Sequence, residues 1–153
     1  MVSRRRQRFS PIKFEGMLLL MAAKPARTLR IVVADDHPSI RENLRYLLNA
    51  ERGLVVVGVA KDGHDALRVV HATRPEVLVL DSDMRDLSGI EVAEAVRRDG
   101  SRIGIVLYTL DGDVCAEAKQ VGIDACVMKD SPPSMLIAAI RGAAHAVPIP
   151  PAP

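Results

Sequence analysis

Short apolar runs alternate along the chain with segments in which apolar residues recur every three or four positions. The runs are rich in Val and Ile and cover residues 29–34, 54–60, 76–80, 103–109 and 125–128. Such nearly continuous runs are typical of strands that are buried on both faces of a parallel sheet. We therefore predict five strands, one at each run.

The segments between the runs have the spacing of amphipathic helices. Apolar residues share one helical face around residues 40–48, 66–70, 90–96, 114–121 and 136–143. Ser131 followed by Pro132 is a typical start for the last helix. A strand and a helix repeated five times predict a doubly wound α/β sandwich with right-handed crossovers. In such sheets the ligand site lies beyond the carboxyl ends of the strands.

The composition fits one globular domain with an aliphatic core. The chain has 153 residues, of which 48% are hydrophobic, 26% are charged and 3% are aromatic. So few aromatic residues argue against a domain that stacks RNA bases and against a flavin site. Cys115 and Cys126 are too few for a disulfide scaffold and lack C-x-x-C spacing, which predicts unpaired cysteines in a reducing, cytoplasmic setting. We expect Cys126 to be a small core residue.

Charge divides the chain into a basic head and an acidic remainder. Residues 1–30 carry eight basic residues and one acidic residue, a net charge of +7, whereas residues 31–153 carry 13 basic and 18 acidic residues, a net charge of −5. An acidic domain argues against specific nucleic-acid binding, so any non-specific binding of DNA would belong to the head. We place the domain at residues 29–145, between a head at 1–28 and a proline-rich tail at 146–153.

Three interpretations of the head stay open. It is a disordered basic tail, an extension that precedes the true start at Met17 or Met21, or an export signal. Its apolar run at 17–23 is seven residues long, which is far too short to span a membrane. The tail has four prolines among its last seven residues, which predicts an extended segment or the beginning of a linker.

Polar residues stand at the carboxyl ends of four of the five predicted strands. Three clustered carboxylates repel one another and favour a hard cation such as Mg²⁺. A lysine and a hydroxyl beside them could hold the oxygens of a transferring phosphoryl group, with one carboxylate as the nucleophile. These strand-end residues are Asp35 and Asp36, Asp81 with Asp83 two positions on, Thr109, and Lys129.

The residues around these strand ends resemble a known family of signalling domains. The motifs D-D-H-P at 35–38, D-S-D-M at 81–84 with Gly89, and K-D-S-P at 129–132, together with Thr109, resemble the receiver domain of two-component response regulators of the NarL/LuxR type. The resemblance covers residues 29–145. It implies a flavodoxin-like (βα)5 fold with a parallel sheet in the strand order 2-1-3-4-5.

The resemblance also implies a function. Asp81 would accept a phosphoryl group from the phosphohistidine of a sensor histidine kinase, with Mg²⁺ as cofactor. The arrival of the phosphoryl group would change partner binding at the face built by the fourth helix, the last strand and the last helix. The implied metal ligands are Asp35, Asp36, Asp81 and the backbone carbonyl of Asp83, and the implied contacts to the phosphoryl oxygens are Thr109 and Lys129.

Four departures from the family pattern modify these expectations. Arg85 stands where a proline is usual, which predicts a looser loop after Asp81. Leu110 replaces a small residue and is expected to narrow the access to Asp81. Cys126 replaces an aromatic residue, so the usual threonine–aromatic switch cannot operate in its usual form. The proline-rich tail follows where a helix-turn-helix domain is usual, which indicates either a stand-alone receiver or a truncated regulator.

Two other functions remain as alternatives. One is a receiver-like adaptor that works without phosphorylation. The other is a phosphatase of the haloacid-dehalogenase type, because the D-S-D at 81–83 resembles its D-x-D motif, although the acidic pair here comes first. We expect no enzymatic activity beyond phosphorylation and dephosphorylation of Asp81. The expected partners are a sensor histidine kinase and an output protein, and a homodimer is left open.

His37 has two interpretations at this point. It is a ligand or base of the site, or it belongs to the start of a helix. Its position before Pro38 favours the helix start.

Overall fold

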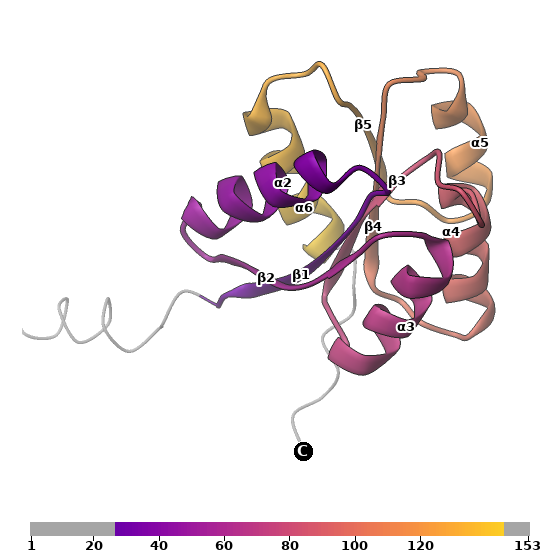
Figure 1. Ribbon diagram of the computed structural model, residues 1–153, viewed down its shortest axis with the longest axis horizontal. Helices are drawn as coiled ribbons and strands as arrows, with labels where there is room; N and C mark the ends of the chain where they lie inside the picture. The colour runs from indigo at the N-terminus through magenta and orange to yellow at the C-terminus, as the bar shows by residue number, and fades with distance from the viewer. Residues whose placement is uncertain (1–26, 146–153) are drawn as a thin grey trace, which may run out of the picture.

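The computed structural model describes residues 27–145, which form five strands and five helices in alternation (Figure 1). The basic head, except for its last two residues, and the proline-rich tail lie outside the described residues. No helix within 27–145 is long and apolar enough to cross a membrane. The elements are β1 Leu29–Ala34, α2 Pro38–Ala50, β2 Leu54–Ala60, α3 Gly63–Thr73, β3 Val77–Asp81, α4 Gly89–Arg98, β4 Gly104–Thr109, α5 Val114–Gln120, β5 Ala125–Met128 and α6 Pro133–His145.

The five strands form one parallel sheet in the order β2-β1-β3-β4-β5, which confirms the predicted fold. Four predicted boundaries, in three elements, were wrong by one residue. Strand β3 runs from Val77 to Asp81 because pairing with β1 and β4 begins at Val77, and Asp81 still pairs with Tyr108. Strand β4 begins at Gly104, opposite Val77. Helix α6 begins at Pro133, one residue later than the Ser131-Pro132 start predicted.

Helices cover both faces of the sheet, which explains why the strands are apolar without alternation. Helices α2 and α6 lie on one face, and α3, α4 and α5 lie on the other (Figure 1). Along β1, Val32 packs into the core under α3 to α5, whereas Ile31 and Val33 pack into the core under α2 and α6. Each strand residue therefore meets a helix whichever way it points.

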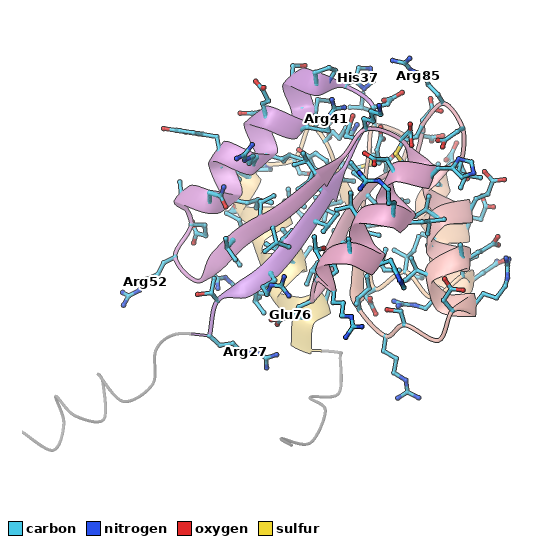
Figure 2. The ribbon with its side chains drawn as sticks, turned by 60° about the horizontal axis from the view of Figure 1, so that its bottom comes forward. Arg27, His37, Arg41, Arg52, Glu76 and Arg85 are labelled. Atoms are coloured by element: carbon cyan, nitrogen blue, oxygen red, sulfur yellow. A yellow bond between two sulfur atoms is a disulfide. The ribbon has the colours of Figure 1, made fainter. Side chains whose placement is uncertain are left out.

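The parallel register brings the carboxyl ends of the strands to one edge. Ala34 pairs with Leu80, and Thr109 pairs with Met128, so the residues that follow these positions emerge side by side. In Figure 2, His37 and Arg85 lie at this end of the molecule and Glu76 lies at the other. This edge is the place where a ligand site is expected in a sheet of this kind.

The prediction of two unpaired cysteines was wrong. Cys115, in α5, and Cys126, in β5, form a disulfide across 11 positions of sequence. The fold places their Cα atoms 5.6 Å apart, inside the range that a disulfide spans. Cys126 does pack against the core under α3 to α5, but as half of a cross-link.

Candidate functional site

Two buried carboxylates face each other across β1 and β3. Asp35 follows β1, and Asp81 is the last residue of β3; they are 1% and 4% exposed. The backbone N–H of Asp35 donates to the carbonyl of Ala60 in β2, which continues the sheet by one residue and fixes the direction of its side chain. A buried carboxylate needs a charged or hydrogen-bonded partner.

Lys129 is the partner of both carboxylates. Its Nζ lies 2.8 Å from Asp35 Oδ2 and 3.1 Å from Asp81 Oδ1, and its side chain is only 10% exposed. It also lies 5.9 Å from the centre of the Tyr108 ring. Lys129 follows β5, and its backbone N–H donates to the carbonyl of Thr109 over 2.7 Å, which extends the pairing of β4 with β5 up to the site.

The protonation equilibria reflect this crowding. Burial, reinforced by the charge of Asp35, raises the pKa of Asp81 above its ordinary value of 3.8 although Lys129 acts in the opposite sense. Burial alone would lower the pKa of Lys129, but its hydrogen bond to Asp35 and the charges of Asp81 and Asp35 outweigh burial and raise the pKa. Lys129 therefore stays charged, and one cation is shared by two carboxylates.

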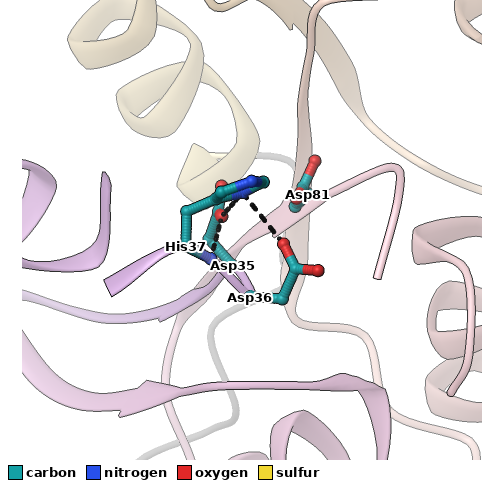
Figure 3. A group of neighbouring side chains, drawn as sticks. All are labelled: Asp35, Asp36, His37 and Asp81. Carbon is teal, nitrogen blue, oxygen red and sulfur yellow. Dashed lines mark hydrogen bonds and ion pairs between the residues drawn. The ribbon is translucent and has the colours of Figure 1, made fainter. Parts of the chain in front are cut away.

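Asp36 and His37 complete the cluster at the surface (Figure 3). The His37 Nδ1 lies 3.2 Å from Asp35 Oδ1 and 3.0 Å from Asp36 Oδ1, and its side chain is 65% exposed. The second contact lies outside hydrogen-bond geometry, so Asp36 Oδ1 is a buried acceptor without a hydrogen bond. His37 is the N-cap residue of α2, but its side chain makes no capping hydrogen bond. The placement of His37 at the start of a helix is confirmed, whereas a role as ligand or base stays a prediction.

The cluster has the composition of a site for a hard cation. Asp35, Asp36, His37 and Asp81 each offer one ligand atom, and these atoms lie within 4.8 Å of one another. Three of the four are carboxylates, which Mg²⁺ prefers, and Asp36 Oδ1 lacks the hydrogen bond that a buried acceptor normally has. The residues therefore fit Mg²⁺. The backbone N–H of Asp83 lies 3.3 Å from Asp81 Oδ1, whereas a metal contact by its carbonyl stays a prediction.

Thr109 lies beside the cluster and is fully buried. Its hydroxyl is 2.6 Å from the Ser82 hydroxyl and accepts a hydrogen bond from the backbone N–H of Asp111 over 3.0 Å. The sequence does not single out Ser82 for this contact, because a serine after a strand has many uses. A contact from Thr109 to a phosphoryl group would require its hydroxyl to exchange one of these partners.

The loop that follows β3 is tied to a neighbouring helix. Asp86 accepts hydrogen bonds from the backbone N–H groups of Gly63 and His64, over 2.7 and 2.8 Å, at the start of α3. The His64 Nδ1 also lies 2.5 Å from Asp86. These bonds anchor the loop that contains Arg85, whose own side chain points away from the body of the protein (Figure 2). The prediction of a looser loop at Arg85 is not tested by these contacts.

A charged hollow of about 320 Å³ borders the cluster at Asp36. Asp36 lines it together with the basic residues Arg41, Lys61 and Arg85. Arg41 also donates to the backbone carbonyl of Asp35 over 2.7 Å, which holds the start of α2 against the site. Leu110 is 72% exposed, and its effect on access to Asp81 stays a prediction.

Comparison with known proteins agrees with this geometry. The family model described as the response regulator receiver domain matches residues 31–141, and the chain belongs to this family. The nitrate/nitrite response regulator protein NarP of Escherichia coli is 35% identical over 78% of this chain. The match covers 56% of NarP, so the chain spans just over half of the length of this relative.

Solved structures lead to the same family. The receiver domain of the putative response regulator NarL from Mycobacterium tuberculosis is 32% identical, with a TM-score of 0.74 over 78% of this chain and 98% of that one. The response regulator TrrA of Thermotoga maritima, solved in complex with Mg²⁺ and BeF, is 28% identical, with a TM-score of 0.69 over 76% of this chain and 99% of that one. The resemblance to receivers of the NarL/LuxR type is confirmed, and neither the adaptor nor the phosphatase alternative finds support.

Proposed function

We propose that this receiver domain accepts a phosphoryl group on Asp81 in the presence of Mg²⁺. One observation carries the proposal: a buried carboxylate at the end of β3 shares a buried lysine with Asp35 and borders an acceptor oxygen of Asp36 that has no hydrogen bond. Ionised Asp81 would attack the phosphorus of a phosphohistidine. The P–N bond breaks, an O–P bond to Asp81 forms, and the released imidazole takes up a proton.

The neighbouring residues would stabilise the charge that develops during transfer. Lys129 already lies 3.1 Å from Asp81 Oδ1, and we assign it to a phosphoryl oxygen. We assign Thr109 to a second oxygen, after release of its contact with Ser82. Asp35, Asp36 and Asp81, with the carbonyl of Asp83, would hold Mg²⁺, which when bound neutralises charge on the transferring group. Dephosphorylation by water at the same site would be the only other reaction.

Partners and location follow from the family. We propose a sensor histidine kinase as phosphodonor and a cytoplasmic location. The relatives of this chain are response regulators and, by name, transcriptional regulators. For this chain we propose an output protein that binds the face built by α5, β5 and α6, with no specific binding of nucleic acid by residues 29–145. The same face could instead bind a second copy of this chain and form a homodimer.

The proposal is tested by the intact mass of the full chain after incubation with acetyl phosphate and Mg²⁺. We expect one adduct of about 80 Da, which is lost when Mg²⁺ is chelated. Asp81→Asn should give no adduct. Asp130→Asn is the matched control, because it makes the same change at an exposed residue next to Lys129, and it should keep the adduct.

Two results would contradict the proposal. An adduct of equal yield in the Asp81→Asn variant would place the phosphoryl group elsewhere. No adduct with acetyl phosphate, and none with a panel of phosphorylated histidine kinases, would mean that Asp81 is not an acceptor in this protein.

A further inference from the structure

The disulfide joins β5, which leads to the edge of the sheet where Asp81 and Lys129 lie, to α5, which follows the strand that ends there in Thr109. Cys126 lies in β5, three residues before Lys129. Cys115 lies in the first turn of α5, six residues after Thr109. The bond therefore closes a loop of chain, Cys115 to Cys126, that lies between Thr109 and Lys129 in the sequence.

Helix α5 has few other attachments to the protein. It is seven residues long, Ala118 is its one buried residue, and its N-terminus has no capping bond from a side chain. Helix α4 on the same face differs, because it buries five residues and begins with a capping box between Ser88 and Glu91. A short helix with so little buried surface opens readily, and a covalent bond to the sheet restricts that opening.

Both cysteines are partly exposed to solvent. Cys115 and Cys126 are each half-buried, not enclosed in the core. Disulfides that occur in a reducing cytoplasm are commonly transient and sense redox state. The cytoplasmic location is part of the proposed function, so the redox role inferred for this disulfide rests on that proposal.

We propose that Cys115 and Cys126 form a reversible redox site that fastens α5 to β5 when oxidised and releases it when reduced. In the oxidised state the loop from Thr109 to Cys115 is held at both ends, because Thr109 is fixed by β4 and Cys115 by β5. In the reduced state α5 is free to move when Thr109 changes its partners. Phosphorylation of Asp81 would then alter α5 in the reduced protein and leave it unchanged in the oxidised protein.

The chemistry is thiol–disulfide exchange with a small disulfide such as oxidised glutathione. The thiolate of Cys115 attacks one glutathione sulfur and releases the first glutathione thiolate. The thiolate of Cys126 then attacks Cys115 Sγ in the mixed disulfide and releases the second. Two cysteine thiols lose two electrons, the glutathione disulfide gains them, and both protons end on glutathione. A dithiol reductant reverses the sequence and becomes a disulfide itself.

The redox site is tested on the full chain in glutathione buffers of increasing oxidation. After each equilibration, free thiols are alkylated and the intact mass is measured. We expect two alkyl groups at the reducing end, none at the oxidising end, and one transition between them. Two alkylated thiols at the oxidising end, or disulfide-linked dimers in place of an internal bond, would overturn the site.

The restriction of α5 is tested by hydrogen–deuterium exchange of the peptide covering 110–124. Reduction with dithiothreitol should speed exchange of the α5 amides by about tenfold or more and leave the α2 amides unchanged. In the Cys115→Ala/Cys126→Ala variant the α5 amides should exchange as fast as in the reduced protein, and dithiothreitol should not change their rate. Equal exchange in the oxidised and reduced wild-type protein would overturn the restriction, whatever the variant does.

Coupling to the phosphoacceptor is tested by adding acetyl phosphate and Mg²⁺ in both redox states. We expect a change in α5 exchange on phosphorylation in the reduced state alone. The same change in both states would overturn the coupling. If no adduct forms in either state, phosphorylated histidine kinases replace acetyl phosphate as the donor. If these give no adduct either, the proposed function and the coupling both fail, while the alkylation and exchange measurements still decide the redox site.

Discussion

At the scale of single residues, the site is an unbalanced group of charges. Lys129 contacts Asp35 and Asp81, and Asp36 adds a third carboxylate beside them. One cation cannot compensate three carboxylates, so the free energy of unfolding is lower than it would be with a neutral group in their place. The arrangement suits a site whose charge is completed by a cation and a phosphoryl group.

Replacement of Asp81 by its neutral analogue should therefore stabilise the protein in the absence of Mg²⁺. The pKa of Asp81 is raised above its unfolded value of 3.8, so its ionisation disfavours the folded state once the pH exceeds 3.8. We expect Asp81→Asn to raise the free energy of unfolding by about 1 kcal/mol at pH 7. The gain should fall away as the pH drops below 3.8 and be nearly gone by about pH 2.5, where the carboxyl is protonated in both states. Urea unfolding at the two pH values measures it, and a loss of stability at pH 7 would contradict this account.

Some residues of the site could be predicted from the sequence and others could not. Asp35, Asp36, Asp81 and Lys129 were predictable because parallel strands bring their carboxyl ends to one edge. The contact between Ser82 and Thr109, and the side chain of His37 over the carboxylates, depend on rotamers that a sequence pattern does not encode. The disulfide was missed because its cysteines have no motif spacing and meet only when α5 packs beside β5.

At the scale of elements, the loop after β3 is held by Asp86 and by Gly89. Asp86 accepts the first backbone N–H groups of α3, and so acts as an N-cap from a distant part of the chain. Gly89 begins α4 against the end of β3, where its backbone N–H donates to the Ser82 carbonyl over 3.0 Å. These two residues fix the loop that leads from Asp81 to α4.

Loss of the Asp86 carboxylate should destabilise the protein in a pH-dependent way. Desolvation, the largest single contribution, opposes its ionisation, but the hydrogen bonds from His64, Gly63 and Leu87 together outweigh it and lower the pKa of Asp86. A carboxyl with a lowered pKa contributes stability above its unfolded value of 3.8 and loses it as the pH falls further. We expect Asp86→Ala to lower the melting temperature at pH 7 and to have less effect at pH 3. Glu94→Ala, at an exposed position of α4, is the control, and an equal effect of Asp86→Ala at both pH values would contradict the explanation.

A side chain at Gly89 should displace the phosphoacceptor. A Cβ atom there would overlap the backbone carbonyl oxygen of Asp81 and press on Leu107. Backbone cannot yield as a flexible side chain does, so we expect Gly89→Ala to lower the free energy of unfolding by about 1–3 kcal/mol. Gly142→Ala is the matched control, because a Cβ in that turn of α6 meets nothing within 4 Å. It should stabilise the protein by about 0.5–1 kcal/mol. Equal thermal melts for the two variants would show that the close approach at Gly89 is unimportant.

The pattern of apolar runs predicts the fold well because a sheet covered by helices on both faces produces that pattern. Helices on both faces of the sheet require strands without alternation, as in Val77 to Leu80, which are all buried. The boundaries were less predictable. Glu76 precedes β3 and Asp81 ends it, because pairing with two neighbours, and not hydrophobicity, decides where a strand begins and stops.

At the scale of the whole molecule, metal binding should be linked to stability. A cation that binds the folded carboxylates and not the unfolded chain raises the free energy of unfolding, by about 2.7 kcal/mol at 100 times its dissociation constant. We expect MgCl2 to raise the melting temperature, and EDTA to reverse the increase. Asp36→Asn should abolish the increase, because it removes the carboxylate whose oxygen lacks a hydrogen bond. The control Asp130→Asn should keep it, and an undiminished Mg²⁺ effect in Asp36→Asn would contradict the assignment of this carboxylate.

The central claim is that Asp81 carries the phosphoryl group, and one measurement tests it directly. The full chain is phosphorylated with acetyl phosphate and Mg²⁺ and then treated with borohydride, which reduces an aspartyl phosphate to homoserine. Peptide sequencing by mass spectrometry locates the altered residue. This account predicts homoserine at position 81, dependent on Mg²⁺ and absent from Asp81→Asn. Homoserine at another aspartate such as Asp36 or Asp83, with position 81 unaltered, would contradict it.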